Sequence, residues 1–432
     1  MAANPTANYY HITQDMKADS IAGFGQVDWK LNDVVKFTGG LRYSYDWEGG
    51  VESTRQITWG LPAFFGFPAF GPGSLGPIQF FGNNLPSVDV TSFLICPTGV
   101  AATVANPTAC TTSATLAPGV KSIATVDPTT GLWSRGLSAS WGAATGTAGI
   151  EWTPDQDSLY YFKYSRGYKA GGFNSGTLSS FPETKPEGVD AYEVGAKNQW
   201  LNHTLQTNLA LFFYDYANMQ IPLSVQPSSG PASTQFFNMK EVFSYGVELE
   251  TIWQPVENAQ ILFNYSYLNA KIHDPVDCFV DGNDPSAILP GDDRGGCPAP
   301  VSPVSVSQKV NGQTVPESPR NRITLNGNYT FHFDPGALTL SVTYIWKDAT
   351  YDSIFNRAYS LAPAYDQVDL RAAFNDIHDR YTIILFGKNV FDSLGYDNAA
   401  GVRLSTDAVA KYQAFGLTPP ATYGVELQVR FR

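Results

Sequence analysis

The sequence predicts an all-β protein that crosses a membrane as an antiparallel β-barrel. Three observations lead to this fold class: little charge, many aromatic residues, and long segments in which apolar and polar residues alternate. Only 15% of the 432 residues are charged, against about 25% in an ordinary soluble domain, and 14% are aromatic. No window approaches the roughly 18 unbroken apolar residues that a spanning helix needs.

The balance of charge excludes two other classes of protein. The chain carries 39 Asp and Glu against 27 Lys and Arg, which gives a formal net charge of -12. A nucleic-acid-binding protein needs a surplus of basic residues to neutralise phosphates, so we expect no nucleic-acid partner. Intrinsic disorder requires few aromatics and many charges, which is the opposite of this composition.

Alternation with a period of two predicts strands, because successive side chains of a strand face opposite sides. Between 338 and 347, for example, Leu338, Leu340, Val342 and Tyr344 fall on one face and small polar residues on the other. This pattern predicts about thirteen strands, at 11–31, 34–47, 133–153, 157–168, 186–201, 204–221, 236–254, 258–272, 319–332, 336–348, 364–375, 379–391 and 421–432.

The connections between these strands alternate strictly between short and long. The short ones lie at 32–33, 154–155, 202–203, 255–257, 334–336 and 376–378. The long ones lie at 48–132, 169–185, 222–235, 273–318, 349–363 and 392–420. Bacterial outer-membrane barrels have short turns on the periplasmic side and long loops outside the cell, so the long connections are predicted to be extracellular.

Tryptophan placement supports a membrane boundary. Trp29, Trp152, Trp200 and Trp253 each come just before a short turn. Amphipathic rings at one common depth form an aromatic girdle where the membrane meets water. We therefore predict that these four residues contact outer-membrane lipid, whereas a soluble β-sandwich would scatter them.

The four cysteines fall in two close pairs within long loops. Cys96 and Cys110 share one loop, and Cys278 and Cys297 share another. Two local disulfides are predicted, which implies an oxidising compartment. Unpaired loop thiols are the alternative, and the absence of CxxC spacing disfavours zinc.

The loop 273–318 is acidic, with six Asp residues and Glu317 against Arg294 and Lys309. We expect these carboxylates to be solvated, and Ca²⁺ binding through their oxygens is the alternative. The spacing fits no EF-hand, so the sequence predicts no metal site and no cofactor. The five histidines are scattered and form no Ser/His/Asp group, so the protein is not expected to be an enzyme.

The predicted number of strands indicates whether the barrel is complete. Thirteen strands are an odd number, whereas bacterial single-chain barrels have an even number. An unclosed sheet would leave two edges of unpaired N–H and C=O groups in lipid. We therefore expect residues 1–432 to be the C-terminal portion of a larger barrel, and closure in a non-native way is the alternative.

The chain resembles the TonB-dependent outer-membrane receptors through a series of ordered motifs. They are FGQVD at 24–28, GLRY at 40–43, YFKYSRGYKAGGFN at 161–174, KPEGVDAYEVGAK at 185–197, LFFYDY at 211–216, YGVELE at 245–250, YSYLNA at 265–270, KNVFD at 388–392 and TYGVELQVRF at 422–431. The resemblance covers nearly all of the chain outside the long loops. It implies a barrel of about 22 strands with a plugged lumen. The plug and the TonB-contacting segment of the family are not visible in this sequence, which fits a fragment.

The resemblance implies TonB-energised uptake of a scarce ligand across the outer membrane of a Gram-negative bacterium. Its implied partners are the TonB complex, the barrel-assembly machinery and a small-molecule ligand. The family usually ends on an aromatic residue that the assembly machinery recognises. Here Phe431 is penultimate, and Arg432 follows it.

Alternation also suggests a ligand-binding surface. It puts Lys163, Ser165 and Lys169 on one face of a strand, near its extracellular end. If the opposite, aromatic face meets lipid, these three residues line the mouth of the lumen. The commonest ligand of the family is a ferric siderophore, and an oligosaccharide or a cobalamin is the alternative. A passive porin and an outer-membrane hydrolase are the competing classes.

Overall fold

The computed structural model describes residues 9–59, 79–81, 85–89, 118–122, 124–176, 178, 182–225, 233–281, 292–298, 306–402 and 412–431. Thirteen strands run the length of its main sheet. They are β1 (Tyr9–Lys30), β2 (Val35–Trp59), β6 (Trp133–Asp155), β7 (Ser158–Lys169), β10 (Glu187–Trp200), β11 (Leu205–Val225), β12 (Ser233–Trp253), β13 (Ala259–Ile272), β16 (Asn321–Phe333), β17 (Gly336–Lys347), β20 (Tyr365–Asp376), β21 (Tyr381–Lys388) and β24 (Thr422–Val429).

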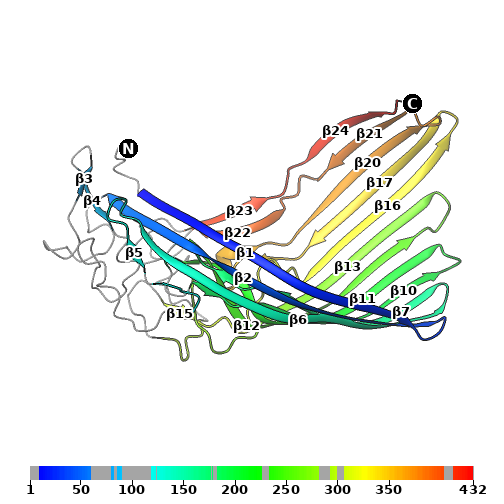
Figure 1. The fold of residues 1–432 in the computed structure, drawn as a ribbon. Coiled ribbons are helices and arrows are strands. Elements are labelled where there is room, and N and C mark those ends of the chain that lie inside the picture. The colour runs from blue at the N-terminus through cyan, green and yellow to red at the C-terminus, as the bar shows by residue number, and fades with distance from the viewer. Residues whose placement is uncertain are drawn as a thin grey trace.

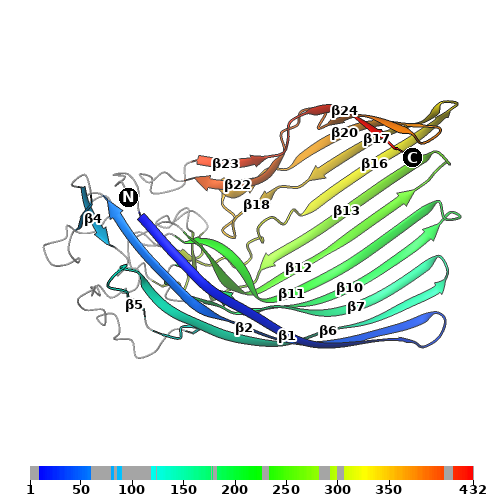
Figure 2. The same ribbon diagram turned by 45° about the horizontal axis from the view of Figure 1, so that its top comes forward.

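These strands pair antiparallel in the order in which they follow along the chain, from β1 to β24. The short turns gather at one end of the sheet and the long connections at the other, as Figures 1 and 2 show. The predicted thirteen strands and their two classes of connection are confirmed. The meander follows from the short turns, because a connection of a few residues can only return the chain to the neighbouring position.

The remaining elements lie within the long connections. They are β3 (Gln79–Phe81), β4 (Leu85–Asp89), β5 (Thr125–Val126), β8 (Gly172–Phe173), β9 (Glu183–Thr184), β14 (Phe279–Val280), β15 (Ser307–Gln308), β18 (Thr350–Tyr351), η2 (Ala358–Ser360), β19 (Leu361–Ala362), β22 (Tyr396–Val402) and β23 (Tyr412–Leu417). Several connections are thus more ordered than predicted. β2 continues into the predicted loop 48–132 because it keeps its pairing with both β1 and β6. No helix in the described part of the chain is long and apolar enough to span a membrane.

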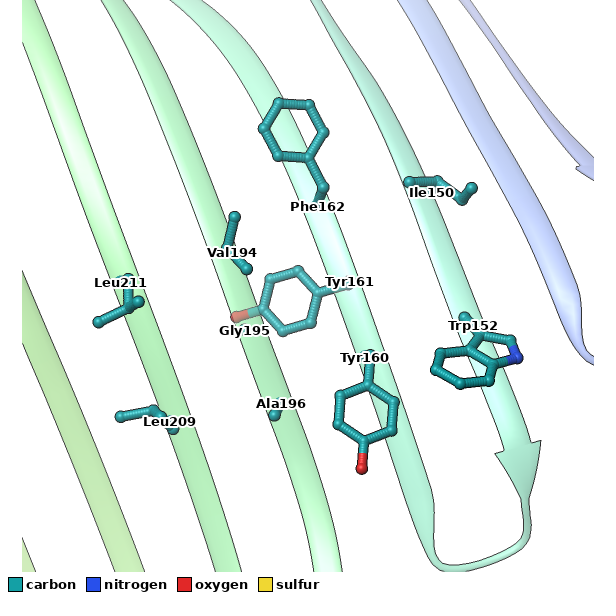
Figure 3. A pocket seen from close by; sticks show the side chains of 10 residues that line it. All are labelled: Ile150, Trp152, Tyr160, Tyr161, Phe162, Val194, Gly195, Ala196, Leu209 and Leu211. Atoms are coloured by element: carbon teal, nitrogen blue, oxygen red, sulfur yellow. The ribbon is translucent and has the colours of Figure 1, made fainter.

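The sheet has one apolar and one polar face. Phe162, Val194 and Leu211 face each other across β7, β10 and β11 and are exposed on the apolar face. Figure 3 shows these side chains beside Ile150 and Leu209. So much exposed apolar surface is stable only against lipid, so the polar face must line the interior.

The outer ends of the strands carry a small hydrophobic core. It joins Ile221, Leu223, Met239 and Val242 of β11 and β12 to Ile272 and to Phe279, Val310, Ile354 and Phe355 of the long connections. A disulfide between Cys278 and Cys297 lies in the same region, with a Cα–Cα distance of 5.8 Å. We call the described residues of 273–318 and 349–363 the hood. The core holds the hood against the outer end of the sheet, and the disulfide links two segments of the hood to each other.

The two outermost long strands of the sheet, β1 and β24, have one partner each. Within the described residues, β1 pairs with β2 and β24 pairs with β21, and the opposite edge of each strand has no partner strand. Both strands run from the loop end of the sheet to the turn end.

Candidate functional site

The polar face of β7, β10 and β11 contains a hollow of about 270 Å³ near its outer half. Lys163 and Ser165 line it, as do Glu193, Tyr214 and Tyr216; Val189 and Ala191 complete its lining. We call these seven residues the inner wall. The placement of Lys163 and Ser165 on the interior face agrees with the alternation of the sequence.

Strand register brings the inner wall together. Lys163 lies opposite Glu193, and Ser165 lies opposite Ala191, which in turn faces Tyr214. Residues directly opposite in an antiparallel pair share a face and have close Cβ atoms. Glu193, Tyr214 and Tyr216 were not predicted as site residues, although the same period-two pattern in 185–197 and 211–216 could have placed them beside Lys163.

Aromatic rings give the inner wall its shape. The Tyr161 hydroxyl donates to Glu193 Oε1 at 2.6 Å, which holds both side chains against the sheet. Phe212 and Tyr214 stack with their centroids 4.9 Å apart, and Tyr216 meets Tyr214 edge-on at 6.4 Å. Lys163 is exposed, and none of the ion pairs in the described residues involves it. An exposed cation beside phenol rings can bind an anionic or aromatic ligand by charge, hydrogen bonds and stacking.

Lys169 lies apart from the hollow. Its ammonium group is 5.8 Å from the centre of the Phe236 ring of β12. It stands at the last position of β7, where the chain leaves the sheet and enters the connection to β10. The three predicted ligand-binding residues therefore divide into two at the inner wall and one at the outer rim.

The connection after Lys169 contacts two distant strands, and we call its described residues, 170–176, 178 and 182–184, the strap. Asn174 makes two hydrogen bonds with the backbone of Phe236, of 2.9 and 2.7 Å. Farther along, the backbone N–H groups of Gly176 and Leu178 donate to Glu52 of β2. β2 and β12 are five places apart in the sheet order, so these hydrogen bonds connect the strap to both strands.

Asp274, Asp281 and Asp292 of the hood are buried or paired with donors, which corrects the expectation of solvation for these three carboxylates, whereas Asp277, Asp293 and Glu317 are exposed. Asp274 has no exposed surface and accepts three backbone N–H groups, from Lys240, Val276 and Asp277. Asp281 is 3% exposed, and Asp292 lies 2.6 Å from the Arg357 guanidinium, which also approaches Asp281. Burial, with the neighbouring Asp274 carboxylate, raises the pKa of Asp277. Internal donors satisfy these acids because buried carboxylates without partners would be costly.

Among the residues that the structure describes, no group of three or more His, Cys, Asp or Glu side chains is arranged to hold a metal ion.

Comparison with known protein families identifies the family of this chain. The family described as "TonB dependent receptor-like, beta-barrel" matches residues 2–390. The chain belongs to the TonB-dependent receptor family. Its members are receptors and transporters of the outer membrane of Gram-negative bacteria, and the resemblance seen in the sequence motifs is confirmed.

Individual relatives of this TonB-dependent receptor chain are distant. It is 22% identical over 274 residues to a probable TonB-dependent siderophore receptor, PiuA, of Acinetobacter baumannii, covering 62% of this chain and 31% of that protein. Its fold resembles the ferric yersiniabactin uptake receptor FyuA of Yersinia pestis, with a TM-score of 0.63 and 15% identity over 98% of this chain and 47% of that one. It also resembles the ferric-catecholate import receptor Fiu of E. coli, with a TM-score of 0.52 and 13% identity over 96% and 45% of the two chains. The chain thus spans about a third of the first relative and about half of each solved receptor.

The remaining predicted residues of this TonB-dependent receptor lie as follows. Trp29, Trp152, Trp200 and Trp253 are exposed next to short turns. Trp29 stacks on Phe37 with centroids 5.7 Å apart, and Trp152 lies 5.4 Å from the Tyr160 ring.

Phe431 and the four cysteines complete the set of predicted residues. Phe431 is 94% exposed just beyond β24, and its role in assembly stays a prediction. Cys278 and Cys297 form the disulfide described above, whereas Cys96 and Cys110 lie outside the described residues.

Proposed function

We propose that this chain belongs to a receptor for TonB-energised uptake of a ferric siderophore across the outer membrane. The observation that carries the proposal is the inner wall, in a chain whose family is that of the TonB-dependent receptors. Lys163 presents an exposed cation beside Tyr214 and Tyr216, and siderophores are anionic or aryl-bearing chelators that such a surface can bind. The relative named as a siderophore receptor supports the same ligand class.

The partners follow from the proposed function. A TonB-energised receptor draws on the inner-membrane TonB complex, and its barrel is inserted by the barrel-assembly machinery. In this proposal the apolar face contacts lipid, the Trp girdle marks the periplasmic boundary, and the hood lies outside the cell. Lys163 and Ser165 contact the ligand in the interior, and Lys169 meets it at the rim.

Growth of a deletion strain on different nutrient sources tests the class of ligand. We expect a strain without this protein to grow poorly when iron is supplied only as a ferric catecholate or hydroxamate chelate, and normally on free iron salts. Normal growth on every chelate, with a defect on an oligosaccharide as sole carbon source or on limiting cobalamin, would replace the siderophore by that ligand. A defect for small solutes that is independent of TonB would indicate a passive pore.

A pair of substitutions tests the inner wall. Lys163→Ala with Ser165→Ala should weaken binding of the ferric chelate about tenfold or more, because a hydrogen bond to a charged group contributes about 1.5–3 kcal/mol. Lys17→Ala is the control, since the Lys17 side chain is 81% exposed on β1, remote from the inner wall. Equal affinity of the double variant and the control would remove these residues from the site.

A further inference from the structure

The apolar face of the sheet is hollowed over Ala196 of β10. This second hollow measures about 310 Å³, and Trp152, Tyr160, Phe162 and Leu211 are among the residues that line it (Figure 3). Ala196 lies opposite Tyr160 of β7, and its small side chain leaves a gap between the larger ones on both sides. An apolar cavity of about 150 Å³ is enough to hold benzene, so the hollow has room for a stretch of hydrocarbon chain.

A buried polar group without a partner lies next to this hollow. Asn198 follows Ala196 by two positions on β10 and therefore shares its face of the sheet. Asn198 is only 7% exposed, and its Oδ1 has no hydrogen-bond partner among the described residues. Thr207, directly opposite on β11, accepts a hydrogen bond from the Trp200 indole at 2.9 Å. A buried acceptor without a donor is costly in apolar surroundings, so Asn198 requires a donor from outside the chain.

The turn beside Asn198 is acidic. Asp155 and Asp157 belong to the connection between β6 and β7, and Ser158, which follows them, lies opposite Asn198. The Asp157 carbonyl oxygen accepts the Gln199 N–H at 2.8 Å, which holds the turn against β10. Two carboxylates at this point favour a cationic donor, because opposite charges attract most strongly where water is partly excluded.

The lipid-facing side of these strands offers no basic side chain to an anion. Lys197 is the only Lys or Arg in 150–162 and 192–211. It stands one position from Asn198 and therefore faces the interior. A lipid with a net negative charge would meet acidic residues here without a compensating cation, so a zwitterionic headgroup fits better.

The aromatic girdle sets the depth of this region. Tyr160 lies opposite both Trp152 and Ala196, so the two girdle rings and the hollow stand at one level of the sheet. Such rings mark the boundary between hydrocarbon and headgroups. The hollow therefore opens toward acyl chains, whereas Asn198 and the acidic turn lie at headgroup level. In the proposed orientation this is the periplasmic leaflet.

We propose that this part of the apolar face binds one phospholipid with a primary ammonium headgroup. An acyl chain lies in the hollow over Ala196, the ammonium group donates to Asn198 Oδ1, and the Asp157 carboxylate balances its charge. A primary ammonium supplies N–H donors that a quaternary one lacks. The site lies on the opposite face of the sheet from the inner wall, so it is a function separate from ligand uptake.

Competition among three lipids with identical acyl chains tests the headgroup. The protein in detergent micelles is mixed with equal amounts of phosphatidylethanolamine, phosphatidylcholine and phosphatidylglycerol, and bound lipid is identified by native mass spectrometry. We expect phosphatidylethanolamine to bind about tenfold more tightly than the other two, the usual effect of a hydrogen bond to a charged group. Phosphatidylcholine has no N–H donor, and phosphatidylglycerol is anionic.

Substitutions separate the two parts of the site. Asn198→Leu removes the acceptor and should lower the affinity for phosphatidylethanolamine to that for phosphatidylcholine, which stays unchanged. Ala196→Phe fills the hollow and should weaken binding of all three lipids. Ala372→Phe is its matched control, because Ala372 of β20 lies on the same apolar face between Leu340 and Leu385, away from the hollow.

Two further measurements distinguish lipid binding from a structural role of Asn198. Asn328→Leu, on the interior face of β16, is the control for loss of an amide and should keep the preference among lipids. Without added lipid, Asn198→Leu should unfold at the same temperature as the parent or higher, because it removes a buried group that has no partner. A loss of phosphatidylethanolamine binding then cannot result from unfolding.

Equal affinity of the parent protein for the three lipids would overturn the proposal, as would an undiminished preference for phosphatidylethanolamine in Asn198→Leu. If Asn198→Leu does not fold, the preference of the parent and the effect of Ala196→Phe decide. The lipid experiment uses no iron chelate, so its outcome is independent of the test of the siderophore site.

Discussion

At the scale of single residues, three acidic side chains of the hood, Asp274, Asp281 and Asp292, are held by internal donors. Asp274 closes a turn through backbone N–H groups, and Arg357 links Asp281 and Asp292. The acidic balance of 273–318 therefore overstates the negative charge that a ligand meets at the entrance, because paired and buried carboxylates contribute little to the outer field.

Asp352 gives the hood a pH dependence. Burial raises the pKa of its carboxyl, and its Oδ1 has no hydrogen-bond partner among the described residues, whereas Oδ2 accepts the Ala399 N–H. A raised pKa means that the folded hood binds the proton more tightly than the unfolded chain. Stability should therefore rise as pH falls from neutral toward about 4, the ordinary range of a carboxyl, and gain nothing below it.

Hydrogen exchange of β22 at several pH values measures this effect. Asp352→Asn keeps an acceptor for Ala399 and should flatten the dependence. Asp127 is the opposite case, because hydrogen bonds from the Thr130 hydroxyl and the Thr129 N–H lower its pKa. Any contribution of Asp127 to stability is therefore present above the ordinary pKa range of a carboxyl group and is lost on acidification. If the stability of Asp352→Asn depends on pH as steeply as that of the parent protein, other groups cause the dependence.

At the scale of elements, three glycines of the polar face lie beneath aromatic rings of the neighbouring strand. Tyr161 lies opposite Gly195, Phe212 opposite Gly246, and Phe386 opposite Gly424. A Cβ on these glycines would meet the facing ring at 2.3, 2.6 and 2.4 Å respectively. Figure 3 shows the Tyr161 ring beside Gly195. Each pair fills the space over one strand with a ring from the next, which pins the register.

Gly195→Ala should therefore destabilise the sheet. The new methyl group displaces the Tyr161 ring and with it the bond to Glu193, at a cost of about 1–3 kcal/mol, typical of overpacking. Urea titration of the protein in detergent or vesicles measures the free energy of unfolding. Gly327→Ala, on β16, is the matched control, because a Cβ there has no atom within 4 Å. Equal losses at the two positions would contradict the pairing argument.

At the scale of the whole molecule, the two edges of the sheet determine how it can exist in lipid. β1 and β24 run in the same direction and each has a free edge within the described residues. An unpaired N–H or C=O in hydrocarbon costs several kcal/mol. We propose that further strands pair with both edges. Because β1 and β24 run in the same direction, the barrel can close with antiparallel pairs only if the number of these further strands is odd.

Hydrogen exchange in the membrane tests this closure. Pairing with β2 protects only those β1 amides that point toward β2. We expect the alternate amides of β1 to be protected as well, by a partner strand on the other side. Rapid exchange at every second amide of β1, within the lipid-facing part of the strand, would show that the edge stays open.

The sequence by itself determined the thirteen strands, their alternation of short and long connections, and the two faces of the sheet. These follow from local rules, since a strand exposed to lipid on one side must alternate and a turn of a few residues must return. The same alternation placed Lys163 and Ser165 in the interior. The family followed from motifs such as 161–174, whose letters are specific enough to identify it.

Only the tertiary structure decided how the long connections fold. Glu52 meets Gly176 across 124 positions of sequence, and Arg357 meets Asp292 across 65. No periodicity relates such residues, because each contact depends on how the curved sheet brings its outer ends together. Alternation grouped Lys169 with Lys163, whereas the structure places the Lys169 ammonium group beside the Phe236 ring of β12. Short-range rules specify a strand and its faces, and long-range packing specifies how the strap and the hood meet the outer ends of the strands.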